Sequence, residues 1–115
     1  MMEEPAVLNP ARFAQMARGD SAGLMEIAGD FFKETRRLMP AWMALLEAGD
    51  YRRLREELHR CKSGASIFGL ERIMAMLIDA ESPMVLEIRG FDVAAFEREL
   101  GAAEGALAAM CKPVA

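Results

Sequence analysis

Apolar residues recur at alternating intervals of three and four over most of the chain, the spacing of one buried face of an α-helix. The longest run comprises Leu24, Ala28, Phe31, Thr35, Leu38, Trp42 and Leu45. It passes through Gly29-Asp30 and keeps its register on both sides of Pro40. We therefore predict one long helix over residues 21–48, kinked at the proline rather than divided into two.

Shorter runs with the same spacing predict the other helices. They comprise Leu54, Leu58, Cys61, Ala65 and Phe68; then Leu70, Ile73, Met74, Leu77 and Ile78; and finally Val93, Phe96, Leu100, Ala103, Leu107 and Met110. A short helix over residues 10–18 presents Phe13 and either Met16 or Ala17. The segment 84–88 is open to two interpretations, because it follows Pro83 and could continue the preceding helix after a bend or form a separate turn.

Turn residues give the boundaries. Gly19-Asp20 and Gly49-Asp50 each supply a C-terminal stop followed by an N-cap oxygen, Gly69 is a C-cap, and Asp92 is an N-cap. Long amphipathic helices with short connections predict an all-α fold, an antiparallel four-helix bundle with a short additional N-terminal helix, in a single domain over residues 1–115. The expected core contains Leu54, Leu58, Cys61, Phe68, Phe31, Trp42, Phe96 and Leu100.

Composition narrows the class of protein. The formal net charge is −4, with 14 Lys and Arg against 18 Asp and Glu and without a long basic run, which argues against nucleic-acid binding. Signal-peptide features and long apolar spans are missing from the sequence, so we expect a cytoplasmic protein without a membrane role. We also expect a monomer. The two cysteines, Cys61 and Cys111, stand far apart outside any CxxC motif, which indicates ordinary reduced thiols.

The chain has a single histidine, His59, and its helical position lies away from the apolar stripe of its helix. Arg52, Arg55, Ser63 and Ser66 share that outer face, and Lys62 flanks it. An exposed neutral imidazole can attack a phosphoryl group, and a nearby ammonium can offset the added charge. Small residues at Ser63, Gly64 and Ser66 would let a partner approach closely.

The sequence lacks the groups that bind and cleave ATP. There is no P-loop, no kinase-like Gly-rich motif, no carboxylate cluster for Mg²⁺ and no set of ligands for another metal. A partner must then supply that machinery. Arg55, Arg60 and Ile67 are candidate docking contacts, although arginines on a helix surface are more often plain solvated charges.

The segment from His59 to Leu70, HRCKSGASIFGL, resembles the signature of histidine-containing phosphotransfer (HPt) domains: His, Lys three residues later, a small Gly/Ser-rich run, then Gly-Leu. The similarity extends over about residues 10–82, including Phe31-Phe32 and the run Leu46 to Asp50. One position departs from the pattern, since the family usually has Gly directly after the Lys and this chain has Ser63.

The resemblance implies a four-helix bundle, phosphorylation of His59, support of the phosphoryl group by Lys62, and a structural turn at Gly69. It implies a phosphocarrier rather than an enzyme, with a sensor or hybrid histidine kinase and response-regulator receiver domains as partners, and with Mg²⁺ held by the receiver. The alternative is a helical adaptor that binds receiver domains without carrying phosphate. A third interpretation is the dimerisation and histidine domain of a sensor kinase. It fits less well, because such a domain would have two long helices per chain and a kinase domain after them, which we do not expect here.

Overall fold

The computed structural model describes residues 6–110, which form six α-helices and no strand. The helices are α1 (Pro10–Ala17), α2 (Ser21–Ala48), α3 (Tyr51–Phe68), α4 (Glu71–Asp79), α5 (Pro83–Arg89) and α6 (Val93–Met110). The all-α prediction is confirmed. Residues 1–5 and Cys111 lie outside the described residues.

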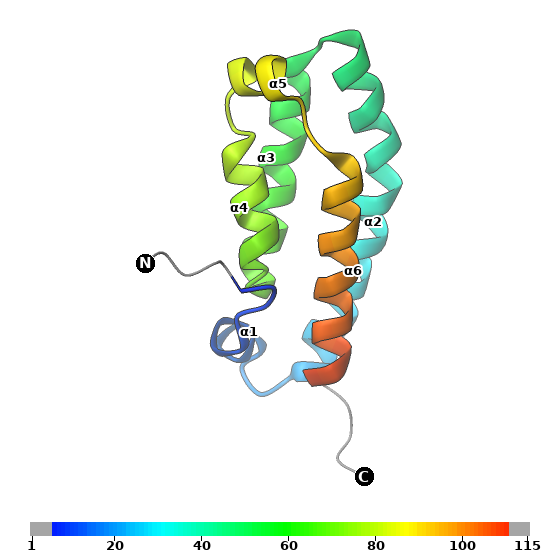
Figure 1. Cartoon of the computed structure of the whole chain (residues 1–115). Helices are drawn as coiled ribbons and strands as arrows, with labels where there is room; N and C mark the ends of the chain where they lie inside the picture. Colours follow the sequence, from blue (N-terminus) through cyan, green and yellow to red (C-terminus); the bar gives the residue numbers. More distant parts are fainter. Residues whose placement is uncertain (1–5, 111–115) are drawn as a thin grey trace, which may run out of the picture.

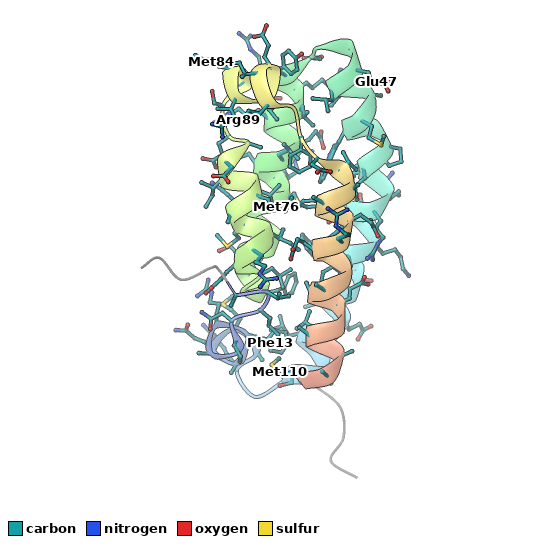
Figure 2. The ribbon with its side chains drawn as sticks, viewed as in Figure 1. Phe13, Glu47, Met76, Met84, Arg89 and Met110 are labelled. Carbon is teal, nitrogen blue, oxygen red and sulfur yellow. The ribbon has the colours of Figure 1, made fainter. Side chains whose placement is uncertain are left out.

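The helices α2, α3, α4 and α6 run antiparallel to their neighbours along one bundle (Figure 1). The chain runs along α2, returns along α3, runs back through α4 and α5, and returns along α6, with α1 lying across one end and α5 at the other. Figure 2 places Phe13 and Met110 at the α1 end and Met84 and Arg89 at the α5 end. The α3 helix packs against α1, α2, α4 and α5, so most of the molecule positions this one helix.

The predicted turn chemistry is confirmed at the caps of α2, α3 and α6, whereas α1 ends one residue before the predicted stop at Gly19, with Arg18 as its C-cap at φ +49°. Asp20 and Asp50 cap α2 and α3 by accepting hydrogen bonds from backbone N–H groups, and Asp92 accepts one from Ala95 N at 2.9 Å. Gly49 and Gly69 end α2 and α3 at φ +73° and +70°. Pro40 lies inside an uninterrupted α2, so the prediction of one helix rather than two holds. The open segment after Pro83 forms a helix of its own, α5.

The core follows most of the predicted positions, with Leu54, Leu58, Phe68, Phe96 and Leu100 at 0–2% exposure. Trp42 is buried among them, and its ring centroid lies 5.7 Å from that of Phe96. The N-terminal helix buries Phe13 and Ala17, while Met16 is exposed.

Some predicted core positions were wrong. In α2 the predicted Phe31 and Leu38 are half-buried and the adjacent Phe32 and Met39 are buried in their place, because α2 must face α6 and α3 together and its buried face falls between them. The other buried residues of α2 are predicted positions, namely Leu24, Ala28, Thr35 and Trp42. Cys61 is also half-buried. At the ends of runs, Val93 and Met74 are half-buried, and Ile78 and Met110 are exposed, since fewer neighbours cover a helix near its end.

Candidate functional site

The site is built on the outer face of α3, where His59 follows the buried Leu58. Leu54, Leu58, Ala65 and Phe68 fix the rotation of α3 in the bundle and leave the His59 side chain 53% exposed. The exposure predicted from the helical pattern is confirmed. A solvent-facing imidazole on a helix held from four sides is accessible to a partner and has a fixed position.

A carboxylate that the sequence analysis did not single out, Glu81, completes the site. Its Oε1 atom lies 3.4 Å from Nδ1 of His59, and the same oxygen accepts a hydrogen bond from Nζ of Lys62. Because Nδ1 faces a carboxylate oxygen, the contact favours the tautomer that carries its proton on Nδ1. In that tautomer the free lone pair of the imidazole is on Nε2.

Glu81 stands in the connection between α4 and α5, and the antiparallel return of the chain places it beside His59. The chain turns at Leu70, and Glu81 follows this residue by about as many positions as His59 precedes it. Residues equally far from the turn of a helical hairpin lie at the same level. That symmetry is the signal by which Glu81 could have been found in the sequence.

Lys62 lies one turn after His59, with its side chain 24% exposed. The hydrogen bond from Lys62 is the largest cause that lowers the pKa of the Glu81 carboxyl below its usual value. Glu81 therefore stays ionised at neutral pH, and a carboxylate, an ammonium group and an imidazole meet at one oxygen atom.

Arg55 and Arg60, both predicted as docking contacts, have different surroundings. The Nε atom of Arg55 donates a hydrogen bond to the backbone oxygen of Glu81 at 2.8 Å, so Arg55 holds the connection that carries the carboxylate. Arg60 has a side chain 76% exposed and lies 3.6 Å from Glu57. Of the two, Arg60 is accessible to a partner.

The small residues near His59 lie on different sides of α3. Ser63 is exposed, whereas Ser66 is half-buried and its backbone oxygen accepts a hydrogen bond from Arg12. Gly64 faces α2, where an added Cβ would lie 2.6 Å from Cε2 of Phe31. Glycine at this position therefore serves the contact between α2 and α3, a reason that the sequence analysis did not give.

Two further predicted residues, Ile67 and Gly69, lie at the C-terminal end of α3. Ile67, two turns beyond His59, is 41% exposed, as expected for a candidate apolar contact. Gly69 ends the helix, and an added Cβ there would lie 3.0 Å from the backbone oxygen of Asn9, so the predicted structural turn also makes room for the N-terminal segment.

Cys61 lies beside the site without joining it. Burial raises the pKa of its thiol to about 11, while a hydrogen bond with Thr35 acts in the opposite direction. A thiol that stays protonated at neutral pH is a weak nucleophile.

Within residues 6–110, no group of three or more His, Cys, Asp or Glu side chains is arranged to hold a metal ion. The helices of the same segment include none long and apolar enough to cross a bilayer.

The antiparallel helical bundle presents an exposed histidine with a lysine one turn later on the same helix. The Hpt domain family matches residues 26–111, most of the chain, and the chain therefore belongs to this family. Domains of the family carry phosphoryl groups on histidine in phosphorelays. A search of curated proteins and a search of solved structures both gave no match.

Proposed function

We propose that this chain carries a phosphoryl group on Nε2 of His59 between receiver domains of a two-component phosphorelay. The observation that supports this most is the position of the single histidine, 53% exposed beside Lys62 on α3 of a chain that belongs to the Hpt family. Ser63, exposed and small, leaves space in front of the imidazole, and Arg60 and Ile67 are the accessible candidates for docking.

The transfer step uses groups of the two proteins together with the Mg²⁺ of the receiver. Nε2 of His59 attacks the phosphorus of an aspartyl phosphate, the new P–N bond forms, and the P–O bond to the aspartate carboxylate breaks. The proton on Nδ1 stays in place against Glu81. Donation to an acceptor aspartate is the reverse step. We expect the receiver to hold the Mg²⁺, and a sensor or hybrid histidine kinase to supply the phosphoryl group.

The test is incubation of this chain with a receiver domain that carries ³²P on its aspartate. We expect label on this chain that is labile in acid and stable in base, and no label on a His59→Gln variant. Absence of label on the wild type, with normal binding to the receiver, would contradict the carrier function and favour a non-transferring adaptor.

A further inference from the structure

The resting position of Lys62 is on the wrong side of the imidazole for a phosphoryl group on Nε2. Nζ of Lys62 is hydrogen-bonded to Oε1 of Glu81, the oxygen that lies 3.4 Å from Nδ1 of His59. Nδ1 and Nε2 are separated by one ring carbon and their outward directions diverge, so the ammonium group, paired with the oxygen that faces Nδ1, is directed to the Nδ1 side. A phosphoryl group on Nε2 would draw the N–H donors of Lys62 away from Oε1 of Glu81.

The backbone of Glu81 is held in place. The hydrogen bond from Nε of Arg55 to the backbone oxygen of Glu81 fixes the connection between α4 and α5. Lys62 has a flexible stem of four methylene groups and lies on the flank of α3 with 24% of its side chain exposed, so it has room to turn.

Resting on the function proposed above, we infer that Glu81 competes with the phosphoryl group for Lys62 and so limits how strongly His59 retains phosphate. Before transfer the ammonium pairs with the carboxylate. After transfer it pairs with the phosphoryl oxygens, and the unpaired carboxylate adds like-charge repulsion. Both effects favour passing the phosphoryl group onward. Glu81 thereby acts as a positioning residue for Lys62, with no bond to the reacting atoms.

The test uses phosphoramidate, a small donor that phosphorylates imidazole with release of ammonia and needs no partner protein. Each variant is equilibrated with a fixed ratio of phosphoramidate to ammonium, and the phosphorylated fraction is measured by intact mass. We expect Glu81→Gln to raise the equilibrium constant for phosphorylation roughly five- to tenfold, the size of one charged hydrogen bond at a partly exposed site. Glu81→Asp, which keeps the charge, should stay near the wild type.

A double-mutant cycle identifies the lysine as the group in competition. In a Lys62→Met background, Glu81→Gln should change the equilibrium constant by less than about twofold, because only screened repulsion is left. An unchanged or lowered constant in Glu81→Gln, or an equal gain with and without Lys62, would overturn the inference. A purely structural role for Glu81 would change the melting temperature and leave the cycle without coupling.

The unmutated chain gives a second test that does not depend on how a variant folds. On phosphorylation, the ¹⁵Nζ resonance of Lys62 and the ¹³Cδ resonance of Glu81 should both shift. If both resonances stay unchanged in the phosphorylated protein, Lys62 has kept its partner and the inference is wrong. Failure of transfer from every receiver domain, with these shifts present, would instead contradict the proposed partners alone.

Discussion

His59 carries the chemistry of the proposed carrier, and its exposure means that the fold does not depend on it. His59→Gln should therefore abolish phosphorylation, because the chain has no second histidine, and leave the melting temperature within a degree or two. Labelling and thermal unfolding on the same preparations check both parts. Label that persists on the Gln variant would show that another residue is the acceptor.

Lys62 should influence transfer more than folding. Replacing Lys62 with Ala removes a charged contact to the phosphoryl group. The same replacement also removes the competing pair of Lys62 and Glu81, which offsets part of the loss, so we expect transfer about three- to tenfold slower rather than abolished. Rapid-quench kinetics with a phosphorylated receiver measures this. Ser63→Gly, which restores the usual family residue, should leave the rate equal or faster. If Lys62→Ala transfers at the wild-type rate, Lys62 has no part in phosphoryl transfer.

The pair of Lys62 and Glu81 makes stability depend on pH in a defined direction. The pKa of the Glu81 carboxyl is lowered in the folded protein, so the pair contributes above the unfolded pKa of about 4.5 and is lost as the pH falls through the folded pKa. The difference in unfolding free energy between wild type and Glu81→Gln should shrink as the pH falls below about 4.5. Urea unfolding across this range measures it, and a difference that grows on acidification would contradict the assignment.

Gly64 links α3 to α2, and a matched pair of glycine substitutions tests this contact. Gly64→Ala should destabilise the fold by about 1–3 kcal/mol, because its Cβ would meet the ring of Phe31. Gly101→Ala on α6, where an added Cβ has no neighbour within 4 Å, should instead stabilise by up to about 1 kcal/mol. Equal effects of the two substitutions in chemical denaturation would show that Gly64 has no packing role.

The helices could be predicted from the sequence because spacing and capping are local. The bounds at Asp20, Asp50 and Gly69 follow from residues within one turn of each helix end. Which of two adjacent aromatic residues is buried is not local, since it depends on where α3 and α6 lie around α2. For this reason Phe32 rather than Phe31 is in the core.

The same distinction holds for the site. His59 and Lys62 lie on one helix, so their proximity follows from the helical repeat. Glu81 reaches the imidazole from the connection between α4 and α5, and its place depends on the whole hairpin formed by α3 and α4. A contact between separate elements cannot be read from the periodicity of either one.

An aromatic cluster of Trp42, Phe91 and Phe96 joins α2, α6 and the connection that follows α5. Phe96 is fully buried, with ring centroids 5.7 Å from Trp42 of α2 and 5.4 Å from Phe91 of the connection after α5. Phe96→Ala should cost about 3–5 kcal/mol of folding free energy from lost burial and the cavity left behind. A loss below about 1 kcal/mol in urea unfolding would show that the end of the bundle is not packed as described.

The most direct test of the carrier function follows the phosphoryl group through the chain. This protein is labelled from a phosphorylated receiver domain, purified, and mixed with a second, unlabelled receiver in Mg²⁺. We predict that label leaves His59 and accumulates on the aspartate of the second receiver, and that His59→Gln breaks the relay at its first step. A wild-type chain that binds both receivers and never becomes labelled would contradict the account.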